Sequence, residues 1–150
     1  MFNSLDNACI PDEWKFAFVH PLFKGKGNID ERDNYRGISI LPPIAKVFER
    51  IVSSQVVSYF ETNSLFVGEQ HGFRANHSCE TALQSILDKW KKKIDDKEVI
   101  LSLFVDFKKA FDLINPDLLF HKLFHYGFDN KSLLFFKSYF QNRKQVTIID

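Results

Sequence analysis

The chain has 150 residues, 45% of them hydrophobic and 26% charged, with only 6 Gly and 5 Pro. This composition excludes a disordered, collagen-like or low-complexity protein, and the length suits one globular domain. The 20 Lys and Arg residues nearly balance the 19 Asp and Glu residues, leaving a formal net charge of +1, so a local basic surface rather than bulk attraction must hold any polyanionic partner.

The N-terminal part of the chain predicts a β-hairpin followed by a helix. Apolar residues alternate along 14–23 (WKFAFVHPLF), and a second short strand is expected at about 35–41, after a polar stretch that contains glycines. A double proline then precedes apolar residues at helical spacing, which predicts an amphipathic helix over about 43–60. Residues 61–76 are expected to form a loop.

The rest of the chain alternates helical and strand patterns. A second amphipathic helix is predicted at about 78–94, and the apolar, β-rich run 99–105 (VILSLFV) is typical of a central strand that is covered on both faces. Helices are expected at 116–125 and 131–140, and QVTII near the end is expected to form another strand. Together these elements predict an α+β fold.

Cysteine content and hydropathy indicate the compartment. Cys9 and Cys79 are the only cysteines, too few for a disulfide framework, so a reducing interior is expected. No apolar run approaches the roughly 20 residues of a membrane-spanning helix. We therefore expect an intracellular protein, in the cytoplasm and/or the nucleus, without a membrane segment.

Asp106 is the most informative carboxylate, since it directly follows the apolar run 99–105. A carboxylate at the end of a buried strand is held by the sheet and faces the cleft there, which suits a metal ligand. The same position also suits the N-cap of a following helix, and spacing alone leaves these two interpretations about equal. An aspartate-based phosphohydrolase is less favoured, because Lys108 stands where its second Asp is usual.

The stretch 104–112 (FVDFKKAFD) resembles motif A of reverse transcriptases, in the form found in non-LTR retrotransposons. Other segments that resemble this family follow in its order: WKFAFVHPLFKGKG, NYRGISIL, PPIAKVFERIV, EQHGFRANHSCETAL, GF and SYFQNRKQV. The resemblance covers about 14–150, and the agreement of several motifs in one order makes it specific. It implies a partial reverse-transcriptase domain, with fingers at about 14–98 and the start of an incomplete antiparallel palm sheet, flanked by helices, at about 99–150.

The resemblance implies a role for three residues of motif A. Asp106 matches the catalytic aspartate that holds the Mg²⁺ ions, and the backbone carbonyl of Phe107 is a further expected ligand beside the nucleotide. Phe111 matches the aromatic gate that lies under the sugar of the incoming dNTP and rejects a 2′-hydroxyl. Its alternative is one more buried Phe. We assign no metal role to Asp112, for which capping or an ion pair with a neighbouring lysine is expected.

Lys24 closes the first predicted strand and Arg36 opens the second, so a hairpin places them across from each other at the two ends of one loop. Paired cations can grip a triphosphate, although solvated loop charges are the ordinary alternative. The resemblance implies that they contact the phosphates of the dNTP, and we expect both to face one open cleft with Asp106. Gly37 stands where the family usually has proline, and the loss of that fixed φ leaves the exact direction of the Arg36 side chain open.

The segment EQHGFR matches a Q-x-G-F-R motif that approaches the template strand in the family. Its matching residues are Gln70, Gly72, Phe73 and Arg74. Phe73 is suited to stacking, Arg74 to pairing with phosphate, and Gly72 to close backbone approach. The structural alternative is a turn anchored by a buried Phe73.

One carboxylate site is too few for two-metal nucleotidyl transfer, which needs at least two. The family's aromatic-x-Asp-Asp hairpin is absent, and Asp95-Asp96 lies on a charged helix end before motif A. We therefore expect a fragment that lacks the C-terminal palm and thumb of its parent and is inactive alone. The parent would extend a DNA primer on an RNA template with dNTPs; the alternative is a non-catalytic remnant that binds nucleic acid without an enzymatic role.

Overall fold

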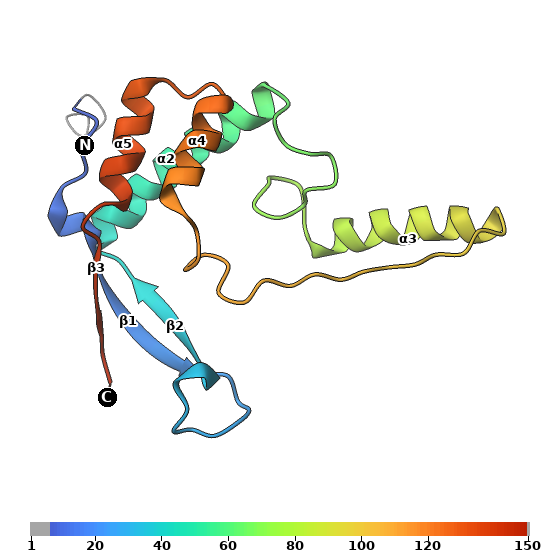
Figure 1. Cartoon of the computed structure of the whole chain (residues 1–150), viewed down its shortest axis with the longest axis horizontal. Helices are drawn as coiled ribbons and strands as arrows, with labels where there is room; N and C mark the ends of the chain where they lie inside the picture. Colours follow the sequence, from blue (N-terminus) through green and yellow to red (C-terminus); the bar gives the residue numbers. More distant parts are fainter. Residues whose placement is uncertain (1–6, 150) are drawn as a thin grey trace. The chain divides into compact units, whose positions relative to one another are not determined.

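The computed structural model describes residues 7–149 and groups them into two units. The first unit contains the described residues up to Ser53 and from Ile114 onward, and the second is Ser54–Leu113. The described residues form four α-helices and one three-stranded sheet (Figure 1). The predicted mixture of helices and strands is confirmed, whereas its division into fingers and palm stays a prediction.

The sheet belongs to the first unit and has the strand order β2-β1-β3. Strand β1 (Phe16–Phe23) pairs antiparallel with β2 (Tyr35–Ile40) and parallel with β3 (Lys144–Thr147). The first strand begins two residues later than predicted, because η1 (Asp12–Lys15) forms a 3-10 turn in which the N–H of Trp14 donates to the Pro11 carbonyl at 3.0 Å. All three strands end near their predicted positions.

The predicted helices are confirmed to within two residues at each end. They are α2 (Pro43–Thr62), α3 (Cys79–Asp95), α4 (Pro116–His125) and α5 (Asn130–Phe140). Polar side chains accept the first free backbone N–H groups of three of them: Ser78 at α3, Asn115 at α4 and Asp129 at α5. In the described part of the chain, no helix is long and apolar enough to cross a membrane.

The core of the first unit is built around Phe48 of α2. Its ring centroid lies 5.2 Å from that of Trp14 in η1 and 6.0 Å from that of Phe135 in α5. Ile10 completes the buried cluster. These aromatic contacts join η1, α2 and α5. The hydrophobic core therefore includes the turn η1, which directly precedes strand β1.

A polar contact connects the same two helices beside this core. The Tyr139 hydroxyl of α5 donates to Glu49 of α2 at 2.8 Å, and the Arg143 guanidinium lies over the Tyr139 ring at 4.6 Å, with Nη2 3.6 Å from the Glu49 carboxylate. Burial, together with the hydrogen bond to Glu49, raises the pKa of Tyr139 to about 12. The hydroxyl therefore stays neutral in the folded protein until strongly alkaline pH.

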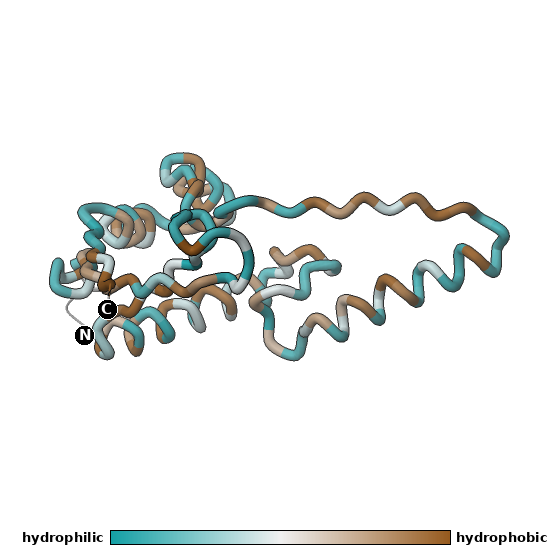
Figure 2. The backbone as a smooth tube through the Cα atoms, turned by 90° about the horizontal axis from the view of Figure 1, so that it is seen from below, coloured by the Kyte–Doolittle hydropathy of each residue, from teal (hydrophilic) through white to brown (hydrophobic). Residues whose placement is uncertain are grey.

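The predicted central strand at 99–105 is not formed in this structure. Residues 99–107 form neither helix nor strand, and Leu101 and Phe104 are 97% and 80% exposed. Figure 2 shows mostly hydrophobic colours along this extended stretch. A strand needs a partner for its backbone groups, and within 7–149 the only sheet consists of β1, β2 and β3.

Candidate functional site

Lys24 and Arg36 lie at the loop end of the β1–β2 hairpin in the first unit. Arg36 pairs with Leu22, and the Lys24 N–H extends the ladder by donating to the Asn34 carbonyl at 2.8 Å. Because side chains alternate along a strand, positions 22 and 24 share the face of Arg36. The two exposed cations are therefore diagonal neighbours at the loop ends rather than directly across from each other. Their contact with a triphosphate stays a prediction.

The loop between these two cations is closed by contacts of its own residues. The Lys24 ammonium donates to the Asp33 carbonyl, and the Asn34 side chain donates to the Asn28 carbonyl at 2.8 Å. Gly27 has φ +84°, and a Cβ there would lie 2.4 Å from the Asn34 amide nitrogen. Glycine suits both this backbone conformation and this close approach.

Gly37 replaces the proline that is usual in the family, and the structure gives a physical reason for a small residue. It lies in β2 opposite Pro21, where a Cβ would approach the Val19 Cγ1 atom to 3.0 Å. Its neighbour Arg36 is held by the same ladder. The register is regular on both sides of Gly37, whereas the direction of the Arg36 side chain toward a phosphate stays a prediction.

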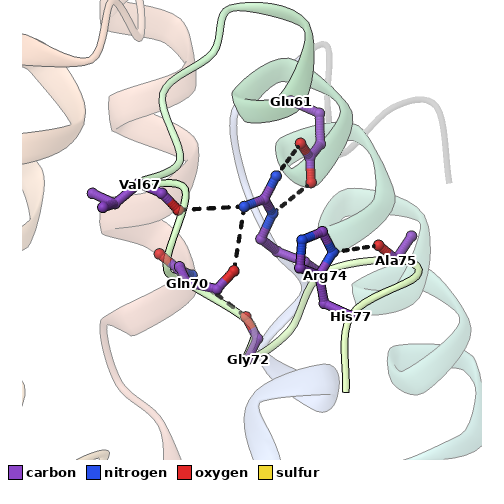
Figure 3. A network of polar contacts seen from close by, with 7 residues as sticks. All are labelled: Glu61, Val67, Gln70, Gly72, Arg74, Ala75 and His77. Carbon is purple, nitrogen blue, oxygen red and sulfur yellow. Dashed lines mark hydrogen bonds and ion pairs between the residues drawn. The ribbon is translucent and has the colours of Figure 1, made fainter. Parts of the chain in front are cut away.

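Arg74 organises the loop between α2 and α3 in the second unit (Figure 3). Its Nε and Nη2 atoms donate to the two carboxylate oxygens of Glu61 at 2.9 and 2.8 Å. Its Nη1 atom donates to the carbonyls of Val67 and Gln70 at 3.3 and 3.2 Å, and the guanidinium carbon lies 4.9 Å from the centre of the Phe66 ring. The side chain thus ties the end of α2 to the turn formed by residues 67–70.

This contact changes the electrostatics of both charged groups. The hydrogen bond from Arg74 holds the pKa of Glu61 below its usual value, and the hydrogen bond to Glu61 raises the pKa of Arg74. The Arg74 side chain is only 13% exposed. Sequence analysis missed Glu61, since a separation of 13 residues across a loop has no characteristic spacing that would have indicated the pair.

Phe73 and Phe111 meet in the second unit, although the sequence assigned them to different motifs. Their ring centroids are 6.2 Å apart at an interplanar angle of 88°, and the residues are 85% and 75% exposed. The alternatives of a buried Phe111 and of a turn anchored by a buried Phe73 are therefore wrong. A Cβ built on Gly72 would meet nothing within 4 Å, so another molecule can approach the backbone closely there.

Asp106 lies in the exposed stretch 99–107, and residues 108–113 form turns rather than a helix. Asp106 therefore neither ends a strand nor caps a helix in this structure, so the N-cap interpretation is wrong, whereas its role as a metal ligand stays a prediction. Its carboxylate and the Phe107 carbonyl are oxygen donors of the kind that Mg²⁺ prefers. Within 7–149, however, no three His, Cys, Asp or Glu side chains are grouped to hold a metal ion, so these residues do not complete a metal site.

The predicted site residues are divided between the two units. Lys24 and Arg36 belong to the first unit, whereas Gln70, Phe73 and Asp106 belong to the second. The prediction that Asp106 and the two cations face one cleft joins residues of different units and stays a prediction.

Comparisons with known proteins agree with the motif order. Residues 24–149 match the family described as "Reverse transcriptase (RNA-dependent DNA polymerase)". The chain is 36% identical to "Probable RNA-directed DNA polymerase from transposon X-element" of Drosophila melanogaster, over 69% of this chain and 12% of that protein. It is 29% identical to "RNA-directed DNA polymerase from mobile element jockey" of Drosophila melanogaster, over 80% of this chain and 13% of that protein. It is also 32% identical to "Putative 115 kDa protein in type-1 retrotransposable element R1DM" of Drosophila melanogaster, over 95% of this chain and 14% of that protein. The chain therefore spans 12% to 14% of the length of these relatives.

Proposed function

Because the chain belongs to the reverse transcriptase (RNA-dependent DNA polymerase) family, we propose that it is the nucleotide- and template-contacting part of a polymerase from a non-LTR retrotransposon. The observation that carries this proposal is the match over 24–149, which includes every residue assigned to the site. The identification made from the motifs is confirmed. The complete polymerase would join dNTPs to a DNA primer 3′-OH on an RNA template, inside the cell, in the cytoplasm and/or the nucleus.

The hairpin cations are proposed to bind the incoming nucleotide. The Arg36 guanidinium can hold two phosphate oxygens in a fork, and the Lys24 ammonium acts as a point charge. Their diagonal placement at one exposed hairpin end supports this role. On this proposal the residues around them, at about 14–98, are the fingers of the polymerase.

Motif A is proposed to contribute one metal ligand and the sugar contact, at the start of a palm that runs over about 99–150. Asp106 would hold a divalent ion, for which Mg²⁺ is the candidate, with the Phe107 carbonyl beside it and Phe111 under the sugar. Since this set does not complete a metal site, the other ligands are expected from the C-terminal palm of the parent protein.

The Gln70–Arg74 segment is proposed to lie along the template strand. The exposed Phe73 ring supports this role, since aromatic rings stack with bases of any sequence. The open space at Gly72 would let the nucleic acid approach the backbone. Gln70 lies two residues before Gly72, and its side-chain amide donates to the Gly72 carbonyl at 3.4 Å.

Primer extension tests the proposal. We expect no Mg²⁺-dependent extension of a DNA primer on an RNA template by the 150-residue chain, and extension by a longer protein that includes the downstream coding sequence. In the longer protein Asp106→Asn should abolish extension, whereas Asp88→Asn, a matched change at an exposed position of α3, should not. Robust extension by the short chain, or by the Asp106→Asn protein, would contradict these assignments. Nucleic-acid binding without any extension by the longer protein would instead favour the non-catalytic alternative.

A further inference from the structure

We propose that Arg74 is a positioning residue, which locks the α2–α3 loop (residues 63–78) and presents the Phe73 ring to a base of single-stranded nucleic acid. On this view Arg74 does not itself contact phosphate, in contrast to the role that the sequence suggested. The nucleic-acid ligand rests on the proposed function, whereas the lock of the loop stands on contacts within the second unit alone.

The hydrogen bonds of Arg74 leave little capacity for a phosphate. A guanidinium has five N–H donors, and four hydrogen bonds of Arg74 go to Glu61, Val67 and Gln70. The fork that would bind a phosphate in bidentate fashion is already occupied by the Glu61 carboxylate. The Phe66 ring packs near the guanidinium carbon, and the side chain is largely buried. Bidentate contact with a phosphate would therefore require some of these hydrogen bonds to break (Figure 3).

The backbone beside Arg74 needs such an anchor. Phe73 has φ +61°, in the left-handed region that is unfavourable for a residue with a large side chain. Arg74 fixes the chain directly after it, and the hydrogen bond from Gln70 to the Gly72 carbonyl fixes the chain directly before it. This conformation turns the Phe73 ring outward, edge-on to the ring of Phe111. An exposed aromatic pair of this kind offers a face for base stacking.

Removal of the Glu61 charge distinguishes a positioning role of Arg74 from phosphate contact, because the two roles predict opposite changes in the affinity for nucleic acid. Glu61→Gln removes a negative charge and releases the guanidinium, so nucleic-acid binding should become tighter if Arg74 binds phosphate. If Arg74 positions Phe73, the same change loosens the loop and weakens binding. Glu69→Gln is the matched control, since it removes an equal charge from the same loop, where Glu69 pairs with Lys89 at 3.2 Å.

The binding experiment uses the full 150-residue chain and a fluorescein-labelled oligouridylate of about 12 nucleotides, with anisotropy measured over a range of salt concentrations. Phe73→Ala, Glu61→Gln and Arg74→Gln should each weaken binding about tenfold, as expected for the loss of one stacked base. The slope of log Kd against log salt should stay unchanged in Arg74→Gln, and Glu69→Gln should not weaken binding. Tighter binding by Glu61→Gln, or a slope smaller by about one in Arg74→Gln, would overturn the proposal.

Amide hydrogen exchange measures the stability of the α2–α3 loop without any ligand. The Gln70 N–H donates to the Val67 carbonyl at 3.0 Å, and its protection should be lost in Glu61→Gln and Arg74→Gln but retained in Glu69→Gln. Unchanged protection of α3 in every variant would confirm that the second unit is still folded. Retained protection of Gln70 in both lock variants would overturn the positioning role. If the lock responds as expected but the unaltered chain binds no oligonucleotide, the stacking role and the proposed nucleic-acid function of this loop are overturned, and the lock is supported.

Discussion

The same substitution, Phe→Ala, should have very different consequences at Phe48 and at Phe104. Phe48 is 2% exposed in the core of the first unit, between the rings of Trp14 and Phe135. Phe104 belongs to the exposed stretch 99–107, where a predicted strand is not formed. The pair therefore tests both the position of the core and the most unexpected feature of the fold with one chemical change.

The magnitude at Phe48 follows from its burial. Removing the ring takes away roughly 100 Å² of buried apolar surface, or about 2.5 kcal/mol at about 25 cal/mol per Å². The cavity left between Trp14 and Phe135 and the loss of two aromatic contacts add about 1 to 2 kcal/mol. We expect Phe48→Ala to lower the free energy of unfolding by about 3 to 5 kcal/mol. Phe104→Ala should change it by less than about 0.5 kcal/mol.

Urea unfolding followed by far-UV circular dichroism measures both values. In a Trp90→Phe background, tryptophan fluorescence adds a local probe, because the remaining Trp14 ring lies beside Phe48. A loss above about 1 kcal/mol in Phe104→Ala would show that the stretch 99–107 is packed in solution and would refute our explanation that it lacks a pairing partner. A similarly small loss in Phe48→Ala would refute the assignment of the core.

Two further predictions concern the first unit. Tyr139 has a pKa of about 12 in the folded protein, above its ordinary 10.0, so its contribution to stability is complete below pH 10 and is lost as the pH rises from 10 to 12. Absorbance at 295 nm should show one late tyrosine titration that Tyr139→Phe removes; simultaneous titration of all tyrosines near pH 10 would contradict it. Gly27→Ala should cost about 1 to 2 kcal/mol more in urea unfolding than Gly25→Ala, because both glycines have positive φ but only Gly27 would clash, with Asn34. Equal costs would show that the loop adjusts freely.

Elements that depend on local spacing were predictable from the chain alone. Helix α4 has the predicted bounds, since a proline at its first position, the Asn115 cap and apolar residues at helical spacing all lie within a few residues of one another. The hairpin that brings Lys24 near Arg36 follows from two alternating segments joined by a loop that contains glycines. The motifs also identified the family, because their residue types and order are properties of the sequence itself.

Contacts between distant residues were decided only in three dimensions. The apolar run 99–105 has every local property of a strand, but pairing requires a neighbouring backbone, and the described sheet does not include this run. The sequence motif indicated that Arg74 matters but not that its charge is directed to Glu61, 13 residues earlier. Periodicity and caps act over one or two turns, whereas ladder partners and ion pairs depend on where the whole chain brings its segments. For this reason the sequence determined the helices and the family, while the tertiary structure decided the exposure of residues 99–107 and the pairing of Arg74 with Glu61.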